Sequence, residues 1–109
     1  MAGLMKQYDI YWVDLNPTLG SEINKIRPAV IISPNEMNDH LNTVIIAPIT
    51  STVKTYPFRA MFTLNRKKAS IALDQVRTID KARLQNPIDT LTNQTIHEIK
   101  NILKEMLVE

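Results

Sequence analysis

The side chains best suited to chemistry are concentrated in one polar stretch of this 109-residue sequence. Residues 16–28 read NPTLGSEINKIRP, and an apolar run over residues 29–32 follows directly. The guanidinium of Arg27 presents several donors in a fork that fits phosphate oxygens, and the carboxylate of Glu22 can accept a proton. On its own, however, an arginine before a proline at the start of a strand more often belongs to a surface ion pair.

Other catalytic chemistries have little support in the sequence. There are no cysteines, so disulfides, thiolate zinc sites and cysteine nucleophiles are excluded. Both histidines are expected on the surface and not in a catalytic site. His40 lies in a turn stretch, and His97 lies beside the apolar face of a predicted C-terminal helix. No HxxxH motif, carboxylate cluster with metal-ligand spacing or glycine-rich phosphate loop is present. We therefore expect neither a metal nor a cofactor.

The composition favours one small domain that spans residues 1–109. With 44% hydrophobic residues the chain can bury a modest core, but it is too short for two domains. The formal net charge of +2 is compatible with a polyanionic partner without requiring one. The longest apolar runs are far shorter than the roughly 20 residues of a membrane span. We expect a cytoplasmic protein with no membrane partner.

Five strand-like runs precede one helix. The runs lie at residues 8–15, 28–33, 43–49, 58–64 and 70–79, and residues 65–68 suit a hairpin tip between the last two. Asp80 can cap a short helical turn that reaches Leu84. Apolar residues recur at helical spacing from 93 to 108, with Thr92 or Asn93 as the N-cap. This order predicts a mainly β fold, a small SH3-like antiparallel barrel of five to seven strands with a C-terminal amphipathic helix.

Six separated motifs occur in the order seen in a known family. They are DIYWVDLNP at residues 9–17, GSE at 20–22, RPAV at 27–30, APITS at 47–51, YPF at 56–58 and DQVRTID at 74–80. Any one of them would mean little. Together, from about residue 8 to residue 84, they resemble the MazF/PemK/Kid toxins of type II toxin–antitoxin systems.

The resemblance implies an mRNA interferase, a sequence-specific endoribonuclease that cuts single-stranded mRNA without a metal and so inhibits translation and growth. In the family reaction the ribose 2′-hydroxyl attacks its own phosphate and leaves a 2′,3′-cyclic phosphate and a 5′-hydroxyl. The family's catalytic arginine falls on Arg27 and its hydroxyl partner on Thr50. A guanidinium would stabilise the charge that builds up on the five-coordinate phosphorus. The base that removes the 2′-proton is either Glu22, in the same loop, or Arg27 itself.

Further polar residues are expected to hold the RNA. On a continuous fifth strand, Gln75 and Arg77 share one face while Asp74 points to the other. Such side chains can read base edges of an unstacked strand, although cross-strand pairing is the simpler explanation. In one family branch the aspartate at position 74 belongs to the active site, but the arginine two residues before it is Ala72 here. The candidate substrate-binding residues are Ser21, Asn24, Lys25, Ser51, Asp74, Gln75 and Arg77.

Cations and aromatic residues add candidates for RNA contact. A phosphate-tracking surface, partly of ordinary solvated charges, could be formed by Lys25, Lys54, Arg59, Arg66, Lys67 and Lys68. Affinity for RNA would then fall with salt. Tyr11 and Trp12 could stack on bases, although aromatic residues on strands more often belong to the core.

Two places depart from the family pattern. Tyr8 stands where the family often has glycine, and INKI at residues 23–26 replaces the glutamine and glycine that commonly precede Arg-Pro. The loss of glycine predicts a stiffer loop in which Asn24 adopts the left-handed conformation. The family's loop closure over RNA, and with it the cleavage sequence, therefore cannot be carried over.

The resemblance also implies partners and leaves alternatives open. It implies a homodimer that buries the sheet rim and part of the C-terminal helix region. It implies an antitoxin whose acidic, flexible tail occupies the RNA groove, with operator DNA bound only together with that antitoxin. The main alternative is a toxin like CcdB, which has the same type of barrel but binds gyrase and has no nuclease activity. A non-catalytic nucleic-acid-binding module is the third possibility.

Overall fold

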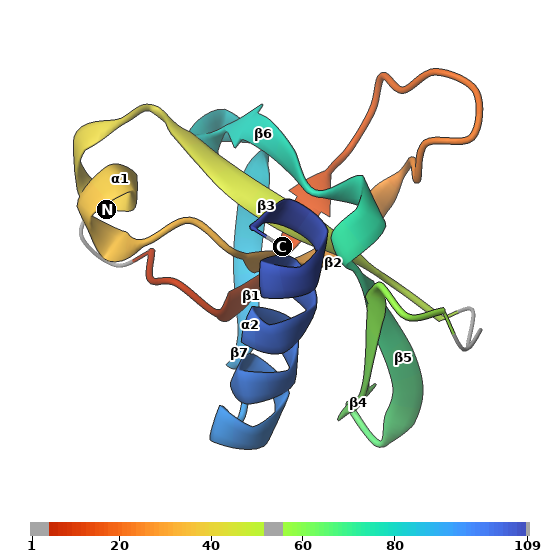
Figure 1. Ribbon diagram of the computed structural model, residues 1–109. Coiled ribbons are helices and arrows are strands. Elements are labelled where there is room, and N and C mark those ends of the chain that lie inside the picture. The colour runs from red at the N-terminus through yellow and green to blue at the C-terminus, as the bar shows by residue number, and fades with distance from the viewer. Residues whose placement is uncertain (1–4, 52–55, 109) are drawn as a thin grey trace.

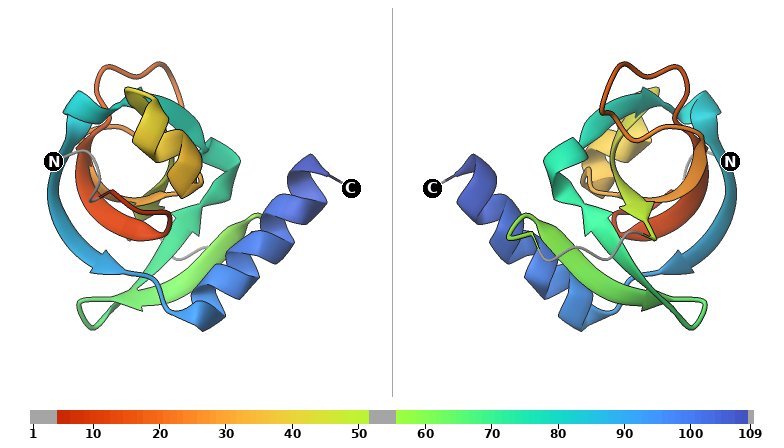
Figure 2. Two further views of the ribbon diagram at one scale, coloured as in Figure 1. Left: turned by 90° about the vertical axis from the view of Figure 1, so that its left-hand side faces the viewer. Right: turned by 90° about the vertical axis from the view of Figure 1, so that its right-hand side faces the viewer.

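The computed structural model describes residues 5–51 and 56–108, and in this part of the chain the fold is mainly β (Figure 1). The elements in chain order are β1 (Asp9–Asp14), β2 (Ile26–Ile31), α1 (Asn35–His40), β3 (Thr43–Thr50), β4 (Arg59–Leu64), β5 (Lys67–Ala72), η2 (Leu73–Gln75), β6 (Arg77–Asp80), η3 (Lys81–Arg83), β7 (Leu84–Thr90) and α2 (Asn93–Leu107). The strand order is β4-β5-β3-β2-β1-β7, and β6 also pairs with β3. All pairings are antiparallel, and the sheet curls into a partly closed barrel (Figure 2). The predicted fold class is confirmed.

Strand β3 organises the sheet because it pairs with three other strands. It lies beside β2 on one edge, where Val30 is opposite Ala47. On its other edge it pairs first with β6, up to Ile46, and then with β5, from Ile49 onward. The predicted continuous strand at residues 70–79 is therefore wrong, since η2 interrupts it. The interruption falls beside Pro48, which has no N–H to offer a neighbouring strand.

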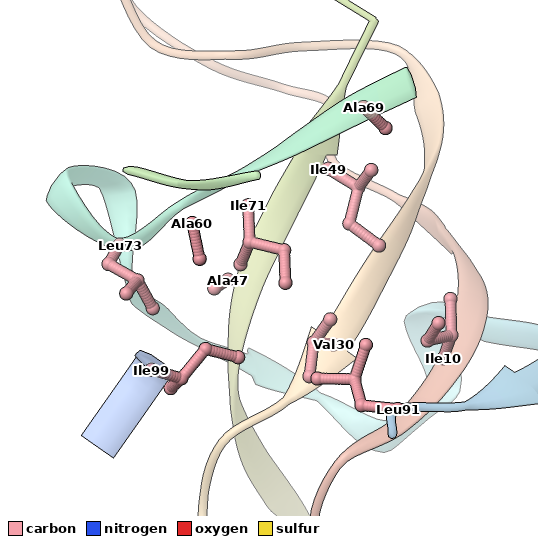
Figure 3. Close-up of a cluster of buried hydrophobic side chains, with 10 residues drawn as sticks. All are labelled: Ile10, Val30, Ala47, Ile49, Ala60, Ala69, Ile71, Leu73, Leu91 and Ile99. Carbon is pink, nitrogen blue, oxygen red and sulfur yellow. The ribbon is translucent and has the colours of Figure 1, made fainter. Parts of the chain in front are cut away.

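Successive side chains of a strand point to opposite faces of the sheet, and a hydrophobic cluster covers part of each face. One hydrophobic cluster lies between the sheet and α2 and includes Ile10, Val30, Ile49, Ile71 and Ile99 (Figure 3). The other fills the curl of the barrel and consists of Tyr11, Val13, Leu15, Ala29, Ile31, Val44, Ile46 and Ile79. Tyr11 is thus a core residue and not a base-stacking candidate.

Helix α2 begins and packs largely as its sequence indicates. The Thr92 side chain accepts a hydrogen bond from the Thr95 backbone N at 3.3 Å, which confirms the N-cap. Ile99 is fully buried against the sheet. The last turn extends beyond the strands (Figure 2), so Leu107, which shares the apolar periodicity, is 72% exposed. In the ranges that the structure describes, no helix is both long and apolar enough to cross a membrane.

Besides η2, two elements were not predicted from the sequence. Helix α1 occupies a stretch whose asparagines and aspartate are typical of a turn. Strand β7 reads LQNPIDT and shows little alternation of apolar residues. It pairs with β1 at the edge of the sheet with register shifts, an environment in which Pro87 is tolerated.

Helix α1 is fixed by a buried polar network around Asn38. The Asn38 side chain has no exposed surface, and its Nδ2 donates to the Ser33 carbonyl oxygen at 2.9 Å. The Ser33 hydroxyl donates to Asn38 Oδ1 and accepts from the Ile45 backbone N at 3.0 Å. Lys81 Nζ donates to the Asn38 carbonyl oxygen. The network therefore joins α1 to both β3 and η3.

The β4–β5 hairpin has a tighter tip than the predicted four residues. Only Asn65 and Arg66 lie between the strands, and both have left-handed φ values, 50° and 66°. Two such residues in succession are typical of a type I′ turn. The strand that follows carries Lys67 and Lys68 along the sheet.

Candidate functional site

Arg27 and Thr50, which lie far apart in the chain, line one polar cleft. Their proximity follows from the strand register, in which Ala29 of β2 is opposite Pro48 of β3. Counted two residues further in the same antiparallel register, position 27 is opposite position 50. The polar cleft has a volume of about 330 Å³ and is lined by Ser21, Glu22, Ile23, Asn24, Arg27, Thr50, Tyr56, Arg59 and Gln75. The three predicted catalytic residues therefore meet in one place.

The Arg27 guanidinium is held at Nε by the loop that precedes β2. The side chain is half-buried, and its Nε donates to the Asn24 carbonyl oxygen at 2.8 Å. This bond uses neither of the two terminal nitrogens of the guanidinium. Thr50 is only 7% exposed and ends strand β3, so its hydroxyl is attached to a rigid element.

Glu22 is positioned within the loop that joins β1 to β2. Its Oε1 accepts from the Leu19 backbone N at 2.5 Å, and its own backbone N donates to the Leu19 carbonyl oxygen at 3.2 Å. The side chain is exposed, and Oε2 takes no part in the Leu19 bond. A carboxylate held in this way can accept a proton inside the polar cleft.

The same loop is tied to the barrel at several points. Gln75 Oε1 accepts from the Ile23 backbone N at 2.7 Å, and within the loop itself Asn16 Oδ1 accepts from the Lys25 backbone N at 3.0 Å. Arg77 Nη1 donates to the Leu15 carbonyl oxygen at 3.2 Å. These bonds make the loop a fixed wall of the polar cleft.

The predicted left-handed residue in this loop is displaced by one position. Lys25 and not Asn24 has a positive φ, of 70°. Asn24 instead provides the carbonyl oxygen that holds Arg27. Tyr8 also has a positive φ, of 73°, at the place where the sequence lacks the family's glycine.

Asp74, Gln75 and Arg77 do not share one strand, so the expected alternation of faces is wrong. Asp74 and Gln75 lie on η2, and Arg77 begins β6. Together with loop residues they line a second hollow of about 440 Å³, formed by Ser21, Glu22, Ile23, Pro48, Asp74, Gln75, Val76 and Arg77. This hollow adjoins the polar cleft, because Ser21, Glu22, Ile23 and Gln75 belong to both.

Two more residues line the cleft: Tyr56, which was not predicted as a site residue, and Arg59, which was predicted only as part of a phosphate-tracking surface. Arg59 Nε and Nη2 donate to the two carboxylate oxygens of Asp74, at 3.0 and 3.2 Å. The Arg59 guanidinium carbon lies 5.3 Å from the ring centre of Tyr56. The sequence signal for this contact is weak, because it depends on Arg59 being opposite Ala72 in the β4–β5 register.

A more apolar hollow lies on the other side of Arg27 and Thr50. Its volume is about 380 Å³, and it is lined by Trp12, Lys25, Ile26, Arg27, Pro28, Ile49, Thr50, Ser51, Leu64, Lys67, Lys68 and Ala69. Trp12 is 40% exposed there. Three of the predicted basic residues, Lys25, Lys67 and Lys68, thus lie around one hollow. Lys54 lies outside the described residues.

Two tyrosines outside the polar cleft, Tyr8 and Tyr11, have raised pKa values. Burial raises the pKa of Tyr8, and burial followed by the nearby Asp9 carboxylate raises the pKa of Tyr11. Within residues 5–51 and 56–108, no three His, Asp or Glu side chains are grouped so as to hold a metal ion.

Comparisons with known proteins identify the family and the fold. The family model for PemK-like, MazF-like toxins of type II toxin–antitoxin systems matches residues 6–107. An endoribonuclease MazF from Staphylococcus saprophyticus is 33% identical over 106 residues, which cover 92% of this chain and 88% of the relative. MazF from Deinococcus radiodurans has the same fold, with a TM-score of 0.85 at 23% identity over 96% of this chain and 97% of that one. A mycobacterial endoribonuclease solved in complex with its cognate antitoxin gives a TM-score of 0.79 at 24% identity, covering 94% of each chain. The protein belongs to the PemK-like, MazF-like toxin family of type II toxin–antitoxin systems.

Proposed function

We propose that the protein is a metal-independent endoribonuclease that cuts single-stranded mRNA in the polar cleft. The observation that carries this proposal is the meeting of a guanidinium, a hydroxyl and a carboxylate, from Arg27, Thr50 and Glu22, in one cleft. The homology to an endoribonuclease MazF supports the same activity. Cleavage of mRNA inhibits translation and growth, and it places the activity in the cytoplasm.

The geometry suggests a role for each group in transesterification. Glu22 Oε2 accepts the proton of the ribose 2′-hydroxyl as its oxygen attacks the adjacent phosphorus. The terminal nitrogens of Arg27 donate to the non-bridging oxygens, where negative charge develops, and the Thr50 hydroxyl donates to the same phosphate. The bond from phosphorus to the 5′-oxygen breaks, and that oxygen takes up a proton from water. The products are a 2′,3′-cyclic phosphate and a 5′-hydroxyl.

The flanking hollows suit the nucleotides on either side of the cut. Ser21, Asn24 and the Nε2 of Gln75 offer polar groups for base edges on one side. Ser51 and Lys25 lie in the apolar hollow on the other side, where the exposed face of Trp12 can stack on a base. Arg77 contributes indirectly, because it holds the loop at Leu15.

The protein's partners follow from the same cleft. A cognate antitoxin with an acidic, flexible tail would occupy the cleft and exclude RNA, since both ligands are anionic. Solved relatives from Mycobacterial species and Deinococcus radiodurans are complexes with an antitoxin. We further propose a homodimer that buries the sheet rim and part of the α2 region, and binding of operator DNA only together with the antitoxin.

The proposal predicts that the purified protein cuts a long single-stranded RNA in the presence of EDTA. Primer extension would map the cut sites, and a short oligonucleotide carrying one site would then yield a 2′,3′-cyclic phosphate and a 5′-hydroxyl end. A matched oligonucleotide with a single 2′-deoxyribose before the cut is expected to resist cleavage, because it lacks the attacking oxygen.

Two results would contradict this assignment. Cleavage of the 2′-deoxy oligonucleotide at the same bond would mean that the 2′-hydroxyl is not the nucleophile. Growth inhibition by a protein that leaves RNA intact would favour a toxin that binds another protein.

A further inference from the structure

Arg59 is a second guanidinium in the polar cleft, and it is fixed along one edge. It begins β4, and its side-on pair with Asp74 uses Nε and Nη2, so Nη1 lies outside the pair. Asp74 is engaged through both carboxylate oxygens. The Arg59 side chain is only 12% exposed and that of Asp74 28%. The pair is therefore largely withdrawn from solvent.

An aromatic ring fixes the same guanidinium from a second direction. The Tyr56 ring centre lies 5.3 Å from the guanidinium carbon, within the range of a cation–π contact. Tyr56 in turn stacks on Phe58, with 5.3 Å between ring centres and 19° between the planes. An arginine normally loses much rotamer freedom when it binds a ligand, and here that freedom is already restricted.

The distribution of charge shows what such an arginine can bind. Arg59 lines the polar cleft together with Arg27 and Glu22, whereas Asp74 lines the adjoining hollow behind it. The cleft lining thus carries two guanidinium groups and one carboxylate, and the carboxylate that pairs with Arg59 belongs to the adjoining hollow. In a largely buried ion pair the cost of desolvating both charges offsets much of their attraction, so stability alone does not account for this preorganisation.

We propose that Arg59 binds the RNA phosphate next to the one held by Arg27, and that Asp74 and Tyr56 act through Arg59 as positioning residues. The proposal rests on the endoribonuclease function above. It assigns Asp74 to holding Arg59 in place of the expected role in reading bases, because both oxygens of that carboxylate accept hydrogen bonds from Arg59.

The test measures binding apart from cleavage, with the 2′-deoxy oligonucleotide as the probe. Arg59→Ala is expected to weaken its binding about 10- to 100-fold, which corresponds to the loss of one charge-assisted contact. The plot of log affinity against log salt should become shallower by about 0.7, the value for one phosphate contact on a single strand. The matched control is Lys100→Ala, which removes one exposed cation from α2 and should change neither quantity.

Two further variants separate charge from positioning. Arg59→Lys keeps the cation but loses the planar fork, so the salt slope should stay while affinity falls. Asp74→Asn keeps Arg59 charged but weakens its anchor, so KM for the cleavable RNA should rise with the salt slope unchanged. Circular dichroism and urea unfolding would check that each variant is folded.

The outcomes distinguish this inference from the proposed function. If the wild type cuts RNA and Arg59→Ala binds the probe with wild-type affinity and salt slope, the inference is overturned while the function stands. If Asp74→Asn abolishes cleavage but Arg59→Ala and Arg59→Lys cleave normally, Asp74 contacts the substrate directly and the positioning role is wrong. A wild type that neither binds nor cuts RNA overturns both proposals.

Discussion

Arg27→Ala should leave the fold intact and slow RNA cleavage by about 10³-fold, because it removes a preorganised donor from the phosphate at the moment its charge increases. The side chain is half-buried, and its Nε donates a hydrogen bond to the Asn24 carbonyl oxygen. Its loss should cost the fold only about 1 kcal/mol. Single-turnover cleavage of the mapped oligonucleotide measures the effect on the chemical step.

Two controls make the Arg27 result specific. Lys100→Ala, purified in the same way, removes a cation outside the cleft and should retain the wild-type rate. Arg27→Lys keeps the charge without the fork and should recover only part of the activity. Undiminished cleavage by Arg27→Ala would mean that the arginine is not catalytic.

Asn38→Ala is expected to be the most damaging single change to the fold among those considered. It removes the partner of the buried Ser33 carbonyl and hydroxyl and leaves a small cavity under α1. Leaving such groups unsatisfied should lower the free energy of unfolding by about 2–4 kcal/mol. Urea denaturation would show this as a lower midpoint with an unchanged slope.

The matched control for Asn38 lies on the surface. Asn101 is an exposed asparagine on α2, and its change to alanine should alter stability by no more than about 0.5 kcal/mol. Equal effects of the two substitutions would show that the buried network does not hold α1 in place.

The strands that could be predicted are those with a clear apolar pattern. In β1 and β3 the apolar residues alternate or form a continuous run between turn residues, because these strands are buried. In α2 the apolar residues recur at helical spacing, because one face of the helix covers the sheet. β7 lacks such a pattern because it lies at an edge and is largely exposed. The break between β5 and β6 lies opposite Pro48 of β3. The residues at the break itself therefore carry no signal of it.

Site residues that belong to a family motif could be predicted from the sequence. The roles of residues that depend on tertiary contacts could not. Arg27 and Thr50 were placed through motif matches and Glu22 through its position in the same loop as Arg27. The register of β2 and β3 brings Arg27 and Thr50 together, and all three residues line one cleft. The roles of Gln75 and Arg77 were missed because both bind backbone groups distant in sequence, at Ile23 and Leu15.

Left-handed backbone positions were also difficult to predict. Tyr8 has a positive φ although it is not glycine, because its N donates to Ile31 and its carbonyl oxygen accepts from Leu91. Its side chain also packs on the cluster beneath α2. These contacts offset the cost of the conformation, and none of them can be read from the local sequence.

A double-mutant cycle on cleavage, with Arg27→Ala, Thr50→Val and the pair combined, tests most directly whether the two side chains act on one phosphate. If both side chains stabilise the same transition state, adding Thr50→Val to Arg27→Ala should slow cleavage by no more than about tenfold. Two rate factors that simply multiply would show that the guanidinium and the hydroxyl act independently, which would contradict the shared site.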